Sequence, residues 1–228
     1  MKALVLALGL CLAASSAIAA EAPNTLTPAE TSAGWRLLFD GKSTAGWRGF
    51  KAAAPDKGWT VKDGVLSPDP KTSKDLITKA EFASFELSFQ WKISPKGNSG
   101  VMFHVIEQGD ETYESGPEYQ ILDNSRGEPP PEQAGALFAL YPPSMDMTKP
   151  VGEWNQGKLV VDHGHVQHWL NGMKVAEYDL GSADFKAKVA ASKFKQWPQY
   201  ASSPTGHIAL QNHGDAVWFR SLKIRVLK

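Results

Sequence analysis

The 228-residue sequence contains a single cysteine, Cys11, and this residue falls in an apolar run close to the first methionine. The run follows Met1-Lys2 and ends at the small-residue site Ala17-Ile18-Ala19, which is typical of a secretory signal peptide. Because Leu10 is too large for a lipoprotein signal, we assign Cys11 to the signal peptide and not to lipid attachment. The remaining chain would carry no cysteine, which excludes disulfides, thiolate metal sites and a cysteine nucleophile. We therefore expect a signal peptide over residues 1–20 and export across the inner membrane to the periplasm.

The sequence has no excess of charge of either sign. Its 24 lysines and arginines balance 24 aspartates and glutamates, and no run of five basic residues occurs. These features argue against a nucleic-acid partner. No second apolar segment is long enough to cross a membrane, so we expect a protein that is not membrane-spanning. The neutral charge is compatible with a monomer or an oligomer.

Several catalytic motifs are also missing. There is no His-Glu-x-x-His pattern, no Gly-x-Ser-x-Gly elbow and no phosphate-binding loop. Metalloprotease, serine esterase and nucleotide-dependent enzyme therefore lose support.

What the chain does show is alternation of apolar and polar residues with a period of two. The segment 85–93 alternates cleanly, with Phe85 on the apolar side and Glu86 on the polar side, which is typical of a strand with one wet face. Further strands are expected at 101–106, 118–122, 158–162, 165–170, 173–178, 207–211 and 217–227, with a hairpin turn at Asn171-Gly172.

Only one helix is expected, over 183–196 before Pro198. Residues 21–33 are predicted to be a linker. Residues 127–150, with six prolines, are predicted to be a long loop that could form one wall of a binding site.

The fold class is therefore all-β: residues 34–228 should form a single two-sheet antiparallel β-sandwich, a jelly roll, with one short helix. The eight tryptophans could fill its core or stack on sugar rings, and core packing suits most of them.

The polar sides of three strands supply candidate site residues. Glu118, beside Pro117 and apolar neighbours, could be a general acid, a base or a metal ligand, or simply a solvated carboxylate. His213 lies before Gly214, where a ligand could approach the backbone, or is a turn histidine. The residues that could join them in binding substrate are Gln90, Lys92, His104, Gln120, Asp123, Trp154, Gln211 and Arg220.

Two of these assignments have plain structural alternatives. Asp123 could instead cap its own turn, and Arg220 could pair with an internal carboxylate or face solvent. His163, His165 and His168 resemble a metal cluster, but strand alternation and the Gly164 turn should disperse them.

The order of short motifs resembles a known family. These motifs are Leu38-Phe39-Asp40-Gly41-Lys42 with Gly46-Trp47, Gly58-Trp59, Gly97-Asn98-Ser99-Gly100-Val101, Gly116-Pro117-Glu118-Tyr119-Gln120-Ile121-Leu122-Asp123, Gly152-Glu153-Trp154-Asn155, His168-Trp169-Leu170-Asn171-Gly172, Ser192-Lys193-Phe194, and Gly206-His207-Ile208-Ala209-Leu210-Gln211-Asn212-His213-Gly214 through Phe219-Arg220. Together they resemble the 3-keto-disaccharide hydrolase family over about residues 34–228. In one departure, Phe103-His104 stands where the family pattern has an aromatic residue followed by arginine, so substrate preference could differ.

The resemblance implies a concanavalin-A-like fold and cleavage of glycosides already oxidised at C3, by hydrolysis or β-elimination, in some members with a divalent metal ion. It implies an oxidised carbohydrate as substrate, with Glu118 and His213 as the acid–base pair or as metal ligands. Two alternatives remain at this point. An ordinary glycoside hydrolase would use two carboxylates, for which Glu86 and Glu118 are candidates, and a non-catalytic carbohydrate-binding module would use the fold alone.

Overall fold

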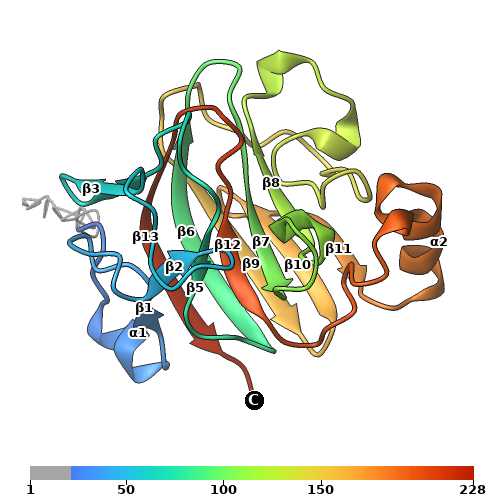
Figure 1. The fold of residues 1–228 in the computed structure, drawn as a ribbon, viewed down its shortest axis with the longest axis horizontal. Coiled ribbons are helices and arrows are strands. Elements are labelled where there is room, and N and C mark those ends of the chain that lie inside the picture. The colour runs from blue at the N-terminus through green and yellow to red at the C-terminus, as the bar shows by residue number, and fades with distance from the viewer. Residues whose placement is uncertain (1–21) are drawn as a thin grey trace, which may run out of the picture.

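The structure is a computed structural model that describes residues 22–228, so the predicted signal peptide lies outside the described residues. Two antiparallel sheets pack face to face, as expected for a jelly roll (Figure 1). Within the described residues the larger sheet has eight strands in the order β11-β10-β9-β6-β13-β4-β3, with β1 also paired to β13. The smaller has five strands in the order β2-β5-β12-β7-β8. The strands are β1 (Arg36–Leu37), β2 (Trp47–Gly49), β3 (Thr60–Lys62), β4 (Val65–Ser67), β5 (Leu76–Thr78), β6 (Phe85–Ile93), β7 (Asn98–Val105), β8 (Glu118–Leu122), β9 (Asn155–Asp162), β10 (His165–Leu170), β11 (Met173–Asp179), β12 (His207–Leu210) and β13 (Val217–Val226).

The alternation seen in the sequence builds the core between the sheets. In β6, Phe89 and its apolar neighbours at every second position are buried while the polar residues between them are partly exposed. Across the sandwich, the ring of Phe89 meets that of Tyr119 from β8 edge to face, with centroids 5.3 Å apart. The two sheets are thus joined by apolar burial, the main favourable term in folding.

The β8 strand departs from simple alternation, because all five of its residues are buried. Tyr119 and Ile121 point into the core between the sheets. Glu118 and Gln120 alternate with them and therefore lie on the outer face of the small sheet. Their burial there means that other segments cover this part of the outer face, and this cover creates the candidate site.

The predicted helix over 183–196 is two elements. α2 (Ala183–Ala191) lies beside one edge of the sandwich (Figure 1), and a 3-10 turn, η4 (Lys193–Gln196), follows it. Ser192 separates them because its backbone is extended, with ψ 179°, and its hydroxyl accepts a hydrogen bond from the amide of Phe194. The break turns η4 towards the small sheet. The described residues also form the 3-10 turns η1 (Thr112–Glu114), η2 (Asn124–Arg126) and η3 (Pro130–Glu132).

The segment expected to be a linker contains a short helix, α1 (Pro28–Ser32). Thr27 and Glu30 form a reciprocal capping box, and Pro28 occupies the first helical turn. Asn24 ties the segment to the sandwich, since its side chain accepts from the Ser221 amide (2.8 Å) and donates to the Gly64 carbonyl (2.8 Å). Among residues 22–228, no helix has the length and apolarity needed to cross a membrane.

Candidate active site

A cavity of about 330 Å³ opens on the outer face of the small sheet. Strands β7 and β8 and the segment that follows β12 form its floor, and η1, η4 and the proline-rich loop form its walls. The residues that line it are Asp75, Asn98, Glu111, Tyr113, Glu118, Gln120, Phe138, Lys193, Phe194, Trp197, Gln211, Asn212 and His213. The structure therefore brings together four of the residues singled out in the sequence: Glu118, Gln120, Gln211 and His213. The expectation that the 127–150 loop walls a site is met by Phe138.

Glu118 is the buried acid of the cavity. Its side chain is 7% exposed and lies directly over Gly100 on the neighbouring strand, where a Cβ atom would come within 2.0 Å of Oε1. Burial raises the pKa of Glu118 to about 8, an effect that nearby Asp75 reinforces and that Lys193 opposes. At neutral pH this carboxyl is therefore mostly protonated, and it can donate a proton.

Lys193 places a positive charge on the cavity wall among aromatic rings. Its ammonium lies 4.4 Å from the ring centroid of Phe138, 5.5 Å from that of Phe194 and 5.8 Å from that of Tyr113. Cation–π contacts of this kind hold an ammonium in place without neutralising it. Lys193 is thus available to a developing negative charge in the cavity.

Within the part of the chain that the structure describes, two amide oxygens in the cavity lack hydrogen-bond donors. Gln120 donates through Nε2 to Oδ1 of Asn98 (3.2 Å) and to the carbonyl of Glu132 (3.1 Å). These bonds fix the orientation of its amide and leave Oε1 buried without a partner. Oε1 of Gln211 is in the same condition. Because a buried acceptor without a donor costs free energy, both oxygens are poised to accept hydrogen bonds from ligand hydroxyls.

Asp75 is a cavity carboxyl that the sequence analysis missed. It accepts hydrogen bonds from the Thr112 hydroxyl and, at 2.9 Å, from the backbone amide of Asn212. Burial is the main reason that its pKa is raised to about 6. Its bond to Asn212 holds the turn that carries His213. A polar residue directly before the fully buried Leu76-Ile77-Thr78 strand was the available signal.

His213 lies at the exposed rim of the cavity. Its neighbour Asn212 anchors the turn by donating through Nδ2 to the carbonyl of Ser73 at 2.7 Å. Within the described residues, the His213 ring makes no hydrogen bond. The imidazole is therefore free to exchange a proton with a ligand, the role for which histidine is most often used.

Four predicted substrate-binding residues lie elsewhere, and their placement in the groove of Glu118 was wrong. Gln90 and Lys92 on β6, Arg220 on β13 and Trp154 before β9 all lie on the outer face of the large sheet, on the opposite side of the sandwich. Arg220 donates to Oε1 of Gln90 at 2.7 Å. Period two reveals which residues share a face of a strand, but it does not reveal to which sheet the strand belongs.

The proposed carboxylate pair of Glu86 and Glu118 fails for the same reason. Glu86 is on the large sheet and pairs with Arg225 at 2.8 Å, whereas Glu118 is on the small sheet. The two carboxyl groups lie on opposite faces of the sandwich and therefore cannot flank one glycosidic bond.

His104 and Asp123 have local roles outside the cavity. His104 adopts φ 52° where the β7–β12 register shifts, and its Nε2 lies 2.7 Å from the Ala83 carbonyl. Its ring lines a separate cavity of about 500 Å³. Asp123 accepts hydrogen bonds from the amides of Ser125 (3.0 Å) and Lys96 (2.6 Å). It therefore caps its own turn, which was the structural alternative to substrate binding.

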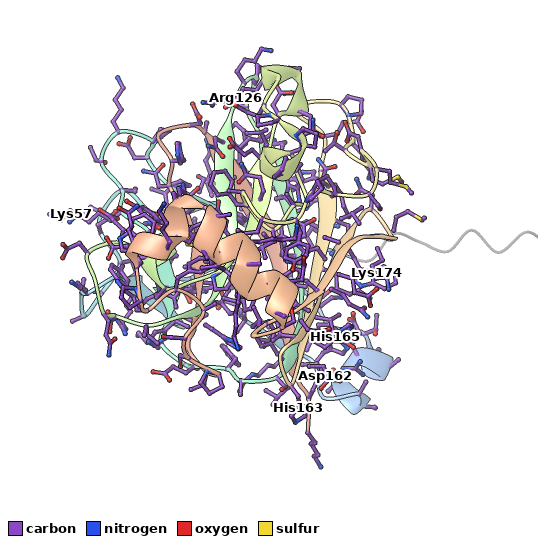
Figure 2. The ribbon with its side chains drawn as sticks, turned by 90° about the vertical axis from the view of Figure 1, so that its right-hand side faces the viewer. Lys57, Arg126, Asp162, His163, His165 and Lys174 are labelled. Atoms are coloured by element: carbon purple, nitrogen blue, oxygen red, sulfur yellow. The ribbon has the colours of Figure 1, made fainter. Side chains whose placement is uncertain are left out.

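The three clustered histidines do not converge. His168 is fully buried in the core and contacts the Gly135 carbonyl and the Tyr178 hydroxyl. His163 and His165 lie with Asp162 at one end of the β9–β10 hairpin, away from Arg126 at the other end of the molecule (Figure 2). Among residues 22–228, no group of three or more His, Cys, Asp and Glu side chains is arranged to hold a metal ion. The Glu118–His213 ligand pair implied by the resemblance therefore lacks a third ligand of these types.

Comparisons with known proteins place the chain in a family. The model of the 3-keto-alpha-glucoside-1,2-lyase-like domain matches residues 34–225. A 3-keto-disaccharide hydrolase of Bacteroides thetaiotaomicron is 34% identical over 92% of this chain and 83% of its own length.

Solved structures agree with this placement. A Parabacteroides distasonis protein solved as a candidate glycosyl hydrolase superposes with a TM-score of 0.85 at 35% identity, covering 91% of this chain and all of its own. The carbohydrate-binding module CBM66 of Bacillus subtilis, at 11% identity and a TM-score of 0.51 over 79% of this chain and 95% of its own, shares the fold alone. The chain therefore belongs to the family of 3-keto-alpha-glucoside-1,2-lyase-like domains.

Proposed function

We propose that this protein cleaves the glycosidic bond of 3-keto-glycosides in the cavity around Glu118. The observation that carries the proposal is the buried, mostly protonated Glu118 beside the cation of Lys193, above a floor with unsatisfied amide oxygens. The family membership and the name of the Bacteroides relative support glycoside cleavage, and the 3-keto substrate is our inference from them.

The chemistry needs an acid, a base and a stabiliser of negative charge. A ketone at C3 acidifies the proton on C2, and a base removes that proton to give an enolate. The bond from C1 to the glycosidic oxygen then breaks as the enolate electrons form the C1–C2 double bond. The leaving oxygen takes a proton from the acid, and addition of water across the double bond completes a net hydrolysis.

The cavity offers one group for each role. Glu118 is assigned as the acid, because its raised pKa keeps the proton that the leaving oxygen requires. His213 at the rim is assigned as the base that removes the C2 proton. Lys193 faces the enolate oxygen as a fixed positive charge, and Gln120 and Gln211 accept hydrogen bonds from sugar hydroxyls.

Trp197 completes the binding surface. Its indole is partly exposed on the cavity wall and packs edge to face on Tyr113 with centroids 5.4 Å apart. An aromatic face held in this way can stack on a sugar ring. The substrate class that fits is a neutral oxidised glycoside with several hydroxyl groups.

A divalent metal stays a prediction from the resemblance. The described residues do not assemble three His, Cys, Asp or Glu ligands for a metal ion. Export to the periplasm likewise stays a prediction from residues 1–20.

A second enzymatic proposal rests on the same cavity. Asp75 and Glu111 join Glu118 among the lining residues, so an ordinary glycosidase could draw its two carboxyl groups from this set. Such an enzyme would cleave the unoxidised sugar, which the first proposal does not expect.

The test compares a 3-keto-glucoside with its unoxidised parent as substrates of the purified protein, and measures the released aglycone. The proposal expects release from the keto substrate alone, and expects Glu118→Gln to slow it by about 10²–10⁴-fold. Release from the unoxidised glucoside at a comparable rate would favour the two-carboxylate enzyme. A parallel assay with a chelator, followed by added divalent cation, tests the metal.

A further inference from the structure

The outer face of the large sheet carries a set of tryptophans and cations that the proposed function does not use. We call it the tryptophan face, and its members are Trp35, Trp154, Trp169, Trp218, Lys92, Lys158 and Arg220. All four indoles are partly exposed. They lie on the far side of the sandwich from Glu118, since each sheet turns its other face to the shared core.

The strand register places these side chains in rows across the sheet. Trp218 pairs with Lys92, Arg220 with Gln90, and Lys158 with Trp169. Gln90 pairs in turn with Gln156, and Ser88 with Lys158, so Trp218 and Trp169 belong to rows four residues apart along β6. At a rise of about 3.4 Å per residue, these rows lie ~14 Å apart. The face is therefore long enough to contact more than one ring of a chain-like ligand.

Each cation of the face is held by an indole instead of a carboxylate. The Lys158 ammonium lies 4.1 Å from the Trp169 ring centroid, and that of Lys92 lies 4.7 Å from Trp218 and 5.3 Å from Trp154. The Arg220 guanidinium lies 4.1 Å from the Trp154 ring. Within residues 22–228, none of these three cations forms a salt bridge.

Other cations of the same sheet are neutralised, which makes the contrast informative. Lys174 is paired with Glu177 at 2.5 Å, and Arg225 with Glu86 at 2.8 Å. Among residues 22–228, the positive charges of Lys92, Lys158 and Arg220 are thus left without a paired carboxylate. An anionic ligand with ring-shaped units satisfies both features.

A groove gives the ligand a place to lie. A cavity of about 380 Å³ lies between Trp35 and Trp169 and is lined by Ser88, Gln156 and Lys158. Glu30 and Lys223 also line it and form an ion pair with each other. The hydroxyl of Ser88 and the amide of Gln156 are hydrogen-bonded to each other at 2.9 Å and supply polar contacts beside the rings.

We propose that the tryptophan face binds an acidic polysaccharide, a chain of uronate-bearing sugars. Its sugar rings stack on the indoles, and its carboxylates pair with Lys92, Lys158 and Arg220. The site is independent of the cleavage cavity, because it stands on different strands and on the opposite face.

The test is calorimetric titration of the protein with hexagalacturonate and with its fully methyl-esterified form, which keeps the rings and removes the charges. We expect the free acid to bind at least tenfold more tightly than the ester, with affinity that falls as salt rises. The variant Lys92→Gln with Lys158→Gln should lose at least tenfold in affinity for the acid. The matched variant Lys57→Gln with Lys186→Gln removes two exposed lysines elsewhere and should bind as the unmodified protein does. Lys57 lies on the other side of the molecule from Lys174, which is the β11 partner of Trp169 (Figure 2).

Circular dichroism and the melting temperature establish that each variant is folded. Glu118→Gln should keep its affinity for the acid. The proposal is overturned if the free acid does not bind, if the ester binds equally well, if the Lys92–Lys158 variant keeps its affinity, or if Glu118→Gln loses it.

Discussion

The two outer faces of the sandwich differ in how far their polar side chains are removed from water. On the small sheet, Glu118 is buried, which shifts its carboxyl pKa to about 8, and the buried amide oxygen of Gln120 has no hydrogen-bond partner among residues 22–228. On the large sheet, Lys92 and Arg220 stay partly exposed and rest on indoles. Removal from water is what perturbs a proton affinity, whereas partial exposure keeps a charge available for surface contact. The first face is therefore suited to proton transfer and the second to adhesion.

The largest expected effect is on the rate when Glu118 can no longer donate a proton. Glu118→Gln keeps the shape of the protonated carboxyl, so we expect kcat on a 3-keto-glucoside to fall by about 10²–10⁴-fold with little change in KM. Glu86→Gln, on the other face, is the matched control and should stay within about twofold of the parent. Equal losses in the two variants would erase the distinction between the faces.

The pH dependence of kcat sharpens the role of Glu118. Because the acid must be protonated and its pKa is about 8, kcat should fall ~10-fold per pH unit above pH 8. A carboxylate acting as base would give the reverse, a rise with pH up to about 8. Stopped assays between pH 6 and 10, with enzyme stability checked at each pH, distinguish the two.

Removal of the cavity cation should have a smaller effect. Lys193→Gln takes away the charge that faces the enolate, and we expect kcat to fall by roughly 10–100-fold. Lys195→Gln, two residues along η4 and exposed, is the control and should leave kcat unchanged. If both variants behave alike, the charge of Lys193 is not part of the reaction.

Stability should move in the opposite direction from activity in Glu118→Gln. The pKa of Glu118 is raised in the folded protein, so between pH ~4.5 and 8 the unfolded chain has lost a proton that the folded chain retains. This group therefore makes the parent less stable as pH rises through that window, and glutamine removes the effect. We expect the variant to match the parent near pH 4.5 and to be about 2–4 kcal/mol more stable at pH 8. Denaturant unfolding at both pH values measures this difference, and a variant less stable at pH 8 would contradict the buried acid.

The smallest effect is expected from the tryptophan face on a small substrate. Lys158→Gln should change kcat/KM for a 3-keto-glucoside by less than about twofold, because Lys158 stacks on Trp169 on the far side of the sandwich. A loss similar to that of Lys193→Gln would mean that the two faces act in one reaction.

Much of the fold was predictable because binary alternation reports burial directly. The strands at Phe85–Ile93 and Glu118–Leu122 and the Asn171-Gly172 hairpin were confirmed at their predicted positions. The helix α1 was missed although Thr27-Pro28-Ala29-Glu30 is a capping-box sequence. The break at Ser192 was missed because the sequence does not reveal that its hydroxyl caps the following turn.

The cavity was predictable only in part. Recognisable motifs surround four of its residues, Glu118, Gln120, Gln211 and His213, and these were singled out. Lys193 appeared only as part of the motif Ser192-Lys193-Phe194 with no role assigned, and Asp75 was not considered. The assignment of Gln90 and Arg220 to the same groove failed because strand pairing between sheets is a long-range property. A period of two fixes which way a side chain points relative to its own strand and nothing about which strand lies beside it.

The most direct test of the central claim follows the C2 proton. A 3-keto-glucoside labelled with deuterium at C2 is compared with the unlabelled substrate, using the parent protein, Glu118→Gln and a reaction without enzyme. The account predicts slower aglycone release from the labelled substrate and loss of deuterium to solvent, both dependent on the parent protein. Equal rates with the label retained in the sugar product would contradict cleavage through C2 deprotonation.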